Sequence, residues 1–366
     1  MKPPIDTAKQ LIAIPSTADN STALNDALGL ITAQLAQHPN ITIERFESDG
    51  KPSLLAYSGE KRPAIFRVLL NGHVDVVPGK PEQFIPTIKD ERLYGRGALD
   101  MKAAAAVLTQ VFIETADKLP YSLGLQIVTD EEIGGENGTA YQLSHGVNAQ
   151  LAIAGESTPL GAICNESRGF CWAEIDFKGI AAHSAYPWNG TNAVLLAQEF
   201  TQKLLAAMPT PPRDEWCTTA NIATISTSNT TFNRVPDQAR VGVDIRFIAS
   251  DTRFASHESA TDFLRQLAPK NSTIHIKKLE ASHFADPESR DAQALAHAVS
   301  KITEKPAEFI YKHGAADIRF FSQRGIPGFS IGVQGEEQHG DNEYTEIASI
   351  ERYAKILTEF LTRLES

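Results

Sequence analysis

The sequence predicts an α/β fold in which a mixed sheet is flanked by helices, with a smaller α+β unit inserted into it. Short apolar strands are expected at 65–70, 123–128 and 151–154. They alternate with an amphipathic helix expected at 20–37 and an Ala-rich helix expected at 101–117. Strands that are apolar throughout and separated by helices indicate a sheet covered on both faces.

The inserted unit is indicated by a change of pattern near Arg168. Alternating strands are expected at 170–178, 218–227 and 240–248, around a helix that begins near Asn192. Such a mixture is typical of a separate α+β unit.

The first pattern resumes after Ala281, with a helix at 290–303 and strands near Phe309 and at 328–333. A domain interrupted in this way returns to its own sheet after the insertion. The predicted domains are therefore an outer domain in two parts, 1–168 and 282–366, and an inserted domain at 169–281.

Composition and charge narrow the class of protein. The 366 residues are 42% hydrophobic and 22% charged, which suits a folded chain of two domains. The charge sum of 34 − 45 = −11 disfavours nucleic acid and anionic membranes as partners and leaves a small-molecule substrate. No apolar run has the length of a membrane span, and the first residues lack the apolar stretch of a signal peptide, so we expect a cytoplasmic protein. The three cysteines include no C-x-x-C pair, so a thiolate metal site is not expected.

The strongest local signal is the segment L-L-N-G-H-V-D-V at 69–76. In an extended chain His73 and Asp75 point to the same side, so the carboxylate can accept the proton of one ring nitrogen and leave the other for a metal. His73 would then be a metal ligand and Asp75 its support. The alternative is a polar turn that closes a strand.

Further acids stand at the ends of predicted elements. Asp100 lies between a glycine-bearing loop and the Ala-rich helix, where it could cap the helix or bridge two cations. Glu131 and Glu132 follow the second strand, where diverging side chains would let Glu131 face a substrate and Glu132 a metal; a solvated acidic turn is the alternative. Glu156 follows the third strand, and strand ends are where open α/β sheets assemble their sites.

His339, near the C-terminus, supplies a second imidazole, although by itself a surface histidine would explain it. A buried cluster of acids survives only if cations neutralise it or some members are protonated. Two histidines with several carboxylates and no cysteine suit a pair of cations such as Zn²⁺. Two such ions would hold a water between them and lower its pKa, so that Glu131 could act as the general base.

The order of these motifs resembles the co-catalytic zinc metallopeptidase family that includes acetylornithine deacetylase, succinyl-diaminopimelate desuccinylase, aminoacylases and glutamate carboxypeptidases. The motifs are G-H-x-D at 72–75, Y-G-R-G-x-x-D-M-K at 94–102, D-E-E at 130–132, G-E at 155–156 and H-x-x-N-E-Y at 339–344. An ordered series of this kind is far more specific than any one of its members.

The resemblance implies a zinc-peptidase-type catalytic domain that holds two Zn²⁺ ions per chain, with Co²⁺ or Mn²⁺ as possible substitutes. One ion would be held by His73, Asp100 and Glu156, and the other by Asp100, Glu132 and His339. The resemblance also makes Asp75 the residue that orients His73 and Glu131 the general acid and base. It further implies a cis peptide bond between Asp100 and Met101.

The same resemblance makes the inserted domain a lid through which a homodimer forms. His183 would reach the active site of the partner subunit and stabilise the oxyanion, with Asn233 as a second hydrogen-bond donor. Arg168 and Arg246 match positions that hold a substrate carboxylate, although each could instead form a structural salt bridge. Gly314 lies in the segment that corresponds to the family's glycine-rich substrate loop.

The substrate class follows partly from the resemblance. Deacylases of the family tend to have Glu at the position of Glu156, so we expect hydrolysis of an N-acylated amino acid. Desuccinylases usually carry a hydroxyl residue where this chain has Ala316, which weakens a desuccinylase assignment. A dipeptidase or a glutamate-carboxypeptidase-like exopeptidase with the same site is the alternative. A non-catalytic scaffold that keeps the fold is a remote one.

Overall fold

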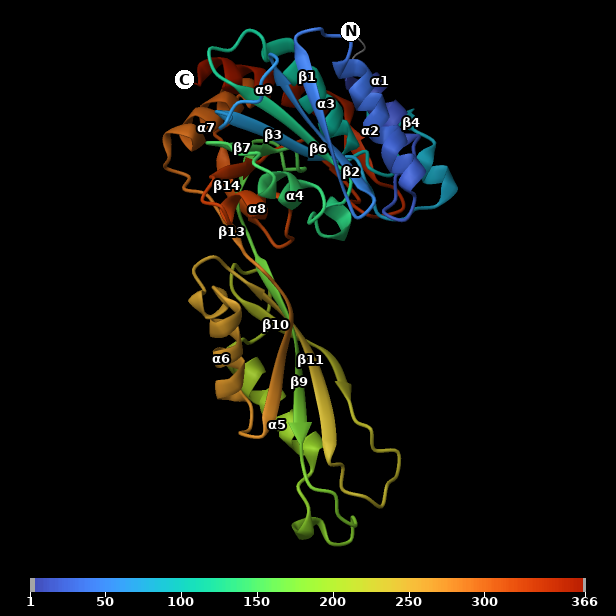
Figure 1. Ribbon diagram of the computed structural model, residues 1–366, viewed down its shortest axis with the longest axis vertical. Coiled ribbons are helices and arrows are strands. Elements are labelled where there is room, and N and C mark those ends of the chain that lie inside the picture. The colour runs from blue at the N-terminus through green and yellow to red at the C-terminus, as the bar shows by residue number, and fades with distance from the viewer. Residues whose placement is uncertain (1–3, 365–366) are drawn as a thin grey trace. The chain divides into compact units, whose positions relative to one another are not determined.

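The computed structural model describes residues 4–364, and their packing divides the chain into two units (Figure 1). The first unit comprises the residues up to Asn165, Phe284–Tyr311 and the residues from Ala316 onward. The second comprises Glu166–His283 and Lys312–Ala315. The inserted domain was expected at 169–281, and the second unit includes 166–283. The short segment 312–315, which packs with the second unit, was not expected there.

The first unit contains most of the helices and strands. Its helices are α1 (Pro4–Ile12), α2 (Ser21–Leu35), α3 (Lys102–Thr115), α4 (Thr139–Ser144), α7 (Arg290–Thr303), α8 (Ile318–Ser322) and α9 (Ile347–Arg363). The strands of its large sheet are β1 (Ile41–Ser48), β2 (Lys51–Ser58), β3 (Val68–His73), β6 (Leu123–Val128), β7 (Ala152–Ala154), β8 (Ala162–Ser167), β13 (His283–Phe284), β14 (Glu308–Lys312) and β15 (Gly328–Ser330).

The large sheet is mixed, with the strand order β1-β2-β6-β3-β7-β15-β8-β13 and with β14 paired to β8. Its central strands β6, β3, β7 and β15 run parallel, and Leu70 of β3 pairs with Leu125 of β6 and with Ile153 of β7. The carboxyl ends of these strands therefore meet at one edge of the sheet. That edge is where open α/β sheets bind ligands.

Both faces of this sheet are covered by helices, as predicted. Successive residues of a strand point to opposite faces, and the fully buried neighbours Leu69 and Leu70 enter two different cores. Leu70 packs in a core that includes α3 and α9, whereas Leu69 packs in a core that includes α4 and α8 (Figure 1). Helix α3 is buried on almost every side, because its run Ala103–Ala106 presents only methyl groups to its neighbours.

A small antiparallel sheet brings two site loops together. It has the order β16-β17-β5-β4, formed by β4 (Thr87–Lys89), β5 (Arg92–Tyr94), β16 (Gly335–Glu336) and β17 (Tyr344–Glu346). Pairing of Tyr94 with Tyr344 places the loop that follows β5 beside the loop that precedes β17. Gly97 has φ +85, and a Cβ there would lie 2.7 Å from Lys102, so the first of these loops requires glycine.

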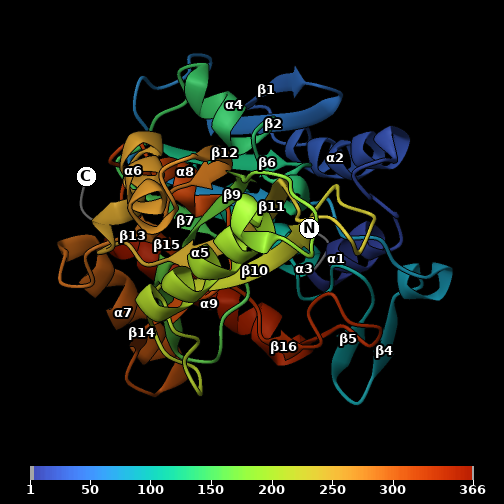
Figure 2. The same ribbon diagram turned by 90° about the horizontal axis from the view of Figure 1, so that it is seen from below.

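The second unit is a four-stranded antiparallel sheet covered by two helices. The strand order is β10-β11-β9-β12. The elements are β9 (Gly169–Lys178), α5 (Ala193–Ala207), β10 (Thr219–Ser226), β11 (Gln238–Phe247), α6 (His257–Leu267) and β12 (Ser272–Glu280). Helices α5 and α6 lie side by side on one face of the sheet (Figures 1 and 2). Asn192 caps α5 by accepting a hydrogen bond from Val194 N at 2.9 Å, as the expected start of this helix requires.

The structure moves the ends of several predicted elements. The strand expected at 65–70 is β3, Val68–His73, because Ile65 is 49% exposed and the ladder begins only at Val68. His73 is consequently the last residue of the strand rather than part of a following turn. The strand expected at 328–333 is shorter and ends at Ser330.

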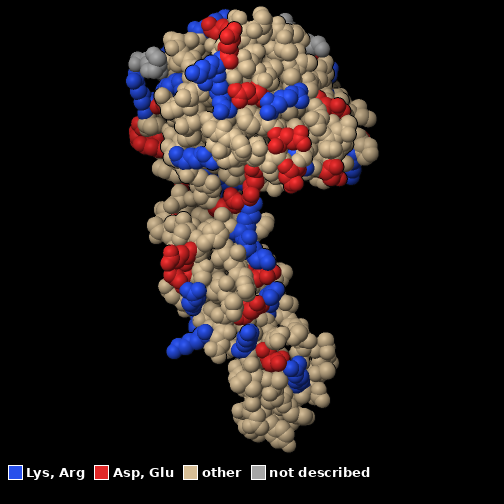
Figure 3. Space-filling model, viewed as in Figure 1, with Lys and Arg blue, Asp and Glu red and all other residues tan. Residues whose placement is uncertain are grey.

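Acidic and basic side chains are interspersed on the visible face of each unit (Figure 3). The net charge of −11 is therefore not gathered into one acidic surface on this face. Among the described residues, no helix combines the length and the apolar character that crossing a membrane requires.

Candidate active site

His73 and Asp75 are arranged as the H-x-D motif predicts. His73 ends β3 with 1% exposure, and its Nδ1 lies 3.1 Å from the carbonyl oxygen of Asp75 and 3.4 Å from its Oδ1. Asp75 is fully buried, and its Oδ2 accepts a hydrogen bond from Glu132 N at 3.0 Å. An Nδ1–H directed at Asp75 leaves Nε2 of His73 as a lone-pair donor toward the site.

Asp100 directs its two oxygens at two different histidines. Its Oδ1 lies 3.1 Å from Nε2 of His73, and its Oδ2 lies 3.1 Å from Nε2 of His339. The peptide bond between Asp100 and Met101 is cis, as expected. A carboxylate placed between two imidazoles has the arrangement that bridging of two cations requires.

Two overlapping groups of side chains could each hold a metal ion. The donor atoms of His73, Asp100 and Glu156 lie within 4.8 Å of one another, and so do those of Asp100, Glu132 and His339. The groups share Asp100 and contain only carboxylate oxygens and imidazole nitrogens, which suits Zn²⁺ and similar divalent ions. The structure thus brings together all five predicted ligands, from segments that lie up to 266 residues apart in the chain, as 339 − 73 = 266.

Electrostatics supports cation binding by this cluster. Burial lowers the pKa of His73, but hydrogen bonds with Asp100 and Asp75 outweigh it and hold the pKa well above its usual value. Hydrogen bonds with Asp100 and Glu132 raise the pKa of His339 to about 10. Burial opposes ionisation of Asp100, yet the two histidines keep its pKa below the usual range. The carboxylates therefore attract positive charge, and metal ions would supply it in place of these protons.

Glu131 lies beside the two groups without belonging to either. Its Oε2 is 3.9 Å from Nε2 of His73, and its side chain is 12% exposed. Burial, with the neighbouring Glu156 carboxylate, raises the pKa of Glu131 well above its usual value, although His73 opposes the shift. A carboxylate that has a raised pKa and lies beside metal-binding side chains is suited to accept and return a proton.

A buried ion pair between Arg96 and Glu343 joins two of the loops that carry proposed ligands, and the sequence indicates no role for either residue. Glu343 Oε2 accepts a hydrogen bond from Arg96 Nη1 at 2.6 Å, while its Oε1 accepts from the backbone N–H of Leu99 at 2.9 Å and of Asp100 at 3.1 Å. Arg96 Nη2 also donates to the carbonyl oxygen of His339 at 3.0 Å. Both residues lie within the quoted motifs, but their pairing across the small sheet has no signature in either segment.

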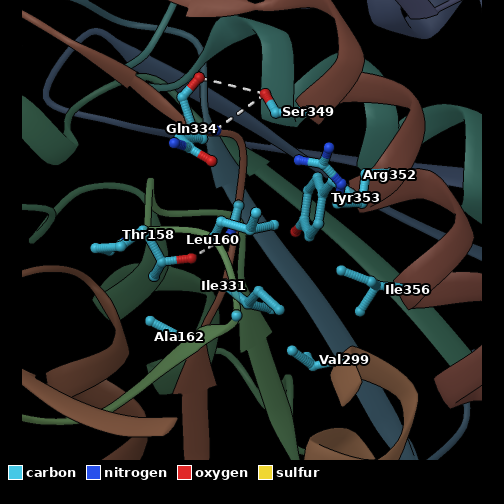
Figure 4. A pocket seen from close by; sticks show the side chains of 13 residues that line it. Thr158, Leu160, Ala162, Val299, Ile331, Gln334, Ser349, Arg352, Tyr353 and Ile356 are labelled. Atoms are coloured by element: carbon cyan, nitrogen blue, oxygen red, sulfur yellow. Dashed lines mark hydrogen bonds between the residues drawn. The ribbon is translucent and has the colours of Figure 1, made fainter. Parts of the chain in front are cut away.

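The loop that carries Glu156 packs against α9. A Cβ at Gly332 would lie 2.5 Å from the carbonyl oxygen of Gly155 and 2.6 Å from that of Glu156, so this backbone approach requires glycine. Beyond Glu156 the chain lines a small pocket together with side chains of α9 (Figure 4). The hydroxyl of Tyr353 is buried in this region, and burial raises its pKa. The backbone at Glu156 thus lies against the chain that follows β15.

The predicted lid residues His183 and Asn233 are neighbours in the second unit. Ser184 N donates to the carbonyl oxygen of Asn233 at 3.0 Å, and His183 and Asn233 are both exposed. Nδ1 of His183 accepts a hydrogen bond from Ala185 N at 3.1 Å, so the ring proton belongs on Nε2. His183 therefore presents an N–H donor, as stabilisation of an oxyanion requires.

Arg168, predicted to hold a substrate carboxylate, has partners within its own unit. Its Nη1 donates to Thr219 Oγ1 at 2.9 Å and to the carbonyl oxygen of Cys217 at 3.3 Å, and its Nη2 contacts Nδ1 of His313. His313 in turn bonds Asp214 through Nε2 at 2.6 Å. His313 is a residue for which the sequence suggested no role, and the structure makes it the partner of Arg168.

The remaining predicted substrate residues also lie in the second unit. Arg246 forms an ion pair with Asp244 at 2.9 Å, which corresponds to the salt-bridge alternative for this residue. Gly314 has open space where a Cβ would lie, so sterics alone do not require glycine there.

Comparison with known proteins identifies the family of this chain. The model of peptidase family M20/M25/M40 matches residues 69–363, a range that includes the five proposed metal ligands and the whole second unit. This chain belongs to that family. It is thus a member of a family of hydrolases that act on amide bonds.

Individual relatives cover nearly the whole chain. The succinyl-diaminopimelate desuccinylase of Sphingopyxis alaskensis is 29% identical over 386 residues, covering 99% of this chain and 98% of that protein. An M20 family metallo-carboxypeptidase from Sulfolobus solfataricus has a TM-score of 0.76 at 19% identity, with 99% of each chain covered. A dinuclear metal-binding peptidase of the M20 family from Bacillus subtilis has a TM-score of 0.72 at 16% identity, covering 98% of this chain and 96% of that chain. The structural likenesses confirm the predicted fold.

Proposed function

We propose that this chain is a metal-dependent amidohydrolase that removes the acyl group from an N-acylated amino acid. The observation that carries the proposal is the pair of donor groups that share Asp100, with Glu131 beside them. The name of the Sphingopyxis alaskensis relative, a desuccinylase, supports a deacylase over a peptidase.

The residues present fit two divalent ions, which we propose to be Zn²⁺, with Co²⁺ or Mn²⁺ as substitutes. His73, Asp100 and Glu156 would hold one ion, and Asp100, Glu132 and His339 the other. When bound, such ions lower the pKa of water and polarise a substrate carbonyl.

The protein's own groups would move the proton. Asp75 holds Nδ1–H of His73 and so keeps Nε2 directed at the cluster. Glu131 would accept the proton of the attacking water on its carboxylate and donate it to the leaving nitrogen of the amide. Its raised pKa favours the first of these transfers, because a more basic carboxylate accepts the proton of water more readily.

We also propose that residues of the second unit act on the substrate. His183 would donate from Nε2 to the oxyanion with Asn233 as the second donor, and Arg168, Arg246 and Gly314 would form the region for the substrate carboxylate. For Arg168 this requires the substrate to compete with His313.

We further propose that two copies pair through the second unit. Phe232 is fully exposed, Trp188 is 75% exposed and Ile180 is 60% exposed, which is costly for large apolar side chains in water. Strand β10 lies at the edge of its sheet and offers unpaired backbone groups to a second copy. Light scattering should give a mass near twice the 39.9 kDa of the chain, and a monomer at micromolar concentration would contradict the pairing.

The activity is tested with metal-free protein to which Zn²⁺ or Co²⁺ is added. The substrates are N-acetyl and N-succinyl amino acids and, in parallel, dipeptides with a free amino group. Turnover of the acyl-amino acids that depends on metal supports the proposal. Turnover of free-amine dipeptides alone would favour the exopeptidase, and binding of less than one ion per chain without activity would favour the scaffold.

The variant Glu131→Gln tests the base separately from the metal. It removes the proton acceptor while it keeps the shape of the side chain, so we expect kcat to fall by about 10²- to 10⁴-fold with metal content unchanged. The exposed Glu60→Gln is the matched control and should behave as the wild type. Intact turnover in Glu131→Gln would overturn the assignment of the base.

A further inference from the structure

Asp317 and Arg319 form a buried ion pair at the start of α8, outside both donor groups. Their side chains are 2% and 3% exposed, and Arg319 Nη1 lies 3.9 Å from Asp317 Oδ1. Burial of two charges costs free energy that their attraction often fails to recover. Each member of this pair also forms hydrogen bonds with other groups.

Arg319 holds the turn that carries Glu131. The turn is a short 3-10 helix, Glu131–Ile133, and Gly134 ends it with φ +118. Gly134 N donates to the carbonyl oxygen of Glu131 at 2.9 Å, and the carbonyl oxygen of Gly134 accepts from Arg319 Nη2 at 2.7 Å. A charge-assisted hydrogen bond thus fixes the peptide that closes this turn.

Asp317 connects the same region to β3. Its Oδ2 accepts a hydrogen bond from Thr139 Oγ1 at 2.6 Å, and Thr139 Oγ1 accepts from Asn71 Nδ2 at 3.0 Å. Asn71 lies two residues before His73, on the strand that this histidine ends. All of these side chains are buried, so the hydrogen bonds are shielded from water.

The close approach of Asp317 to the turn is also visible at Gly135. This glycine has φ +67, and a Cβ there would lie 1.9 Å from Asp317 Oδ1. On the opposite side of the turn, Glu132 N donates to Asp75 Oδ2 at 3.0 Å. The turn is therefore held by two hydrogen bonds, from Glu132 N to Asp75 and from Arg319 to the carbonyl oxygen of Gly134, and Asp317 lies close against Gly135.

We propose that Asp317 and Arg319 are positioning residues that fix the turn bearing Glu131 and Glu132 relative to the strand bearing His73. The inference rests on the proposed function, in which Glu131 moves the proton. Neither residue would touch the substrate. Their effect is geometric, and misplacement of a reacting group by about 1 Å can cost about 10²-fold in rate.

The first test compares Arg319→Met with Arg324→Met. Arg324 Nη1 donates to the carbonyl oxygen of Leu143 at 2.7 Å, so the control removes an arginine-to-carbonyl hydrogen bond of the same length near the same helix, away from the turn. We expect kcat of Arg319→Met to fall by about 10- to 100-fold with KM within about twofold. Arg324→Met should stay within about twofold of the wild type, and Arg319→Lys, which can still donate one hydrogen bond, should recover part of the loss.

The second test does not depend on activity. Hydrogen–deuterium exchange of the amides at 131–135 should be at least about tenfold faster in Arg319→Met than in the wild type or in Arg324→Met, because the closing peptide loses its partner. Amides of β9, in the other unit, should be unchanged. If Arg319→Met does not fold, Thr139→Val removes the donor to Asp317 at a smaller cost and should speed exchange in the same peptide.

The outcomes separate the two proposals. Unchanged exchange at 131–135 and kcat within twofold in Arg319→Met would overturn the positioning role. Equal loss of activity in Arg324→Met would also overturn it, since the effect would then be general destabilisation. If the wild-type protein hydrolyses no amide, the proposed function is wrong. The exchange experiment would still decide whether Arg319 fixes the turn.

Discussion

The variant Glu343→Gln should lower both the stability of the protein and its affinity for metal, although Glu343 is not a proposed metal ligand. The substitution keeps one oxygen for the backbone N–H groups of Leu99 and Asp100. It replaces the oxygen that faces Arg96 Nη1 at 2.6 Å, and an amide NH₂ in that place would direct a donor at a donor. Arg96 is then left with a buried and unpaired charge, because its side chain is only 4% exposed.

The expected magnitude follows from the burial of the pair. Removal of one partner of a buried ion pair costs about 3 to 5 kcal/mol, and the exposures of 4% and 0% place this pair in that class. Loss of a residue that supports metal ligands lowers metal affinity by about 10- to 100-fold. Metal affinity should fall because Glu343 holds the backbone of Asp100 and Arg96 holds the carbonyl oxygen of His339.

Two measurements check these values. Urea denaturation of the metal-free protein gives the free energy of unfolding, and titration with Zn²⁺ against a competing chelator gives metal affinity. The double variant Arg96→Met/Glu343→Gln should recover part of the lost stability, because it leaves no unpaired charge, but it should not recover the metal affinity. A Zn²⁺ affinity of Glu343→Gln within twofold of the wild type, together with a loss of less than about 1 kcal/mol in the free energy of unfolding, would contradict both expectations.

Three further predictions concern other parts of the chain. Burial raises the pKa of the Cys171 thiol to about 12, so at pH 8 a disulfide reagent should label Cys217 first and Cys171 only after denaturation. Since an unfolded cysteine titrates near about 8.5, the folded state binds more protons above that pH, and Cys171 should lower the free energy of unfolding by up to about 1.4 kcal/mol per pH unit as pH rises toward 12. Cys171→Ala should lack that slope. Gly332→Ala places a Cβ 2.6 Å from the carbonyl oxygen of Glu156 and should weaken binding of one of the two metal ions at equilibrium dialysis, whereas unchanged stoichiometry and affinity would contradict this account of the Glu156 loop.

The sequence predicted the parts of the fold that depend on local pattern. Apolar runs placed β6 and β7 to within one residue, and the Ala-rich segment placed α3 to within two residues. The prediction for β3 was displaced, because Ile65 and Phe66 are apolar yet precede the ladder that begins at Val68. The hydrophobic pattern indicates which side chains are buried, whereas the ends of a strand depend on which backbone N–H and C=O groups form ladder hydrogen bonds.

The sequence singled out His73, Asp100, Glu132 and Glu156 as proposed ligands because each stands at or near the end of an expected element, whereas His339 stands in a loop and was assigned through the resemblance. The residues around the cluster were not predictable, since their roles lie in contacts between distant segments. Glu343 bonds the backbone of Asp100, which lies 243 residues away, and Arg319 bonds the carbonyl oxygen of Gly134, which lies 185 residues away. No periodicity relates such positions, so these contacts became visible only in the folded chain.

The amino-acid sequence by itself therefore determined the chemistry available to this protein: an α/β sheet with carboxylates and a histidine at or near the ends of its strands, and a second histidine in a late loop. Tertiary structure alone decided that Asp100 faces two histidines, that His313 is the partner of Arg168, and that segment 312–315 packs with the second unit. The physical reason is that side-chain identity and spacing fix local conformation and donor type. Which donors meet depends on how the sheets and helices pack, and that is a property of the whole chain.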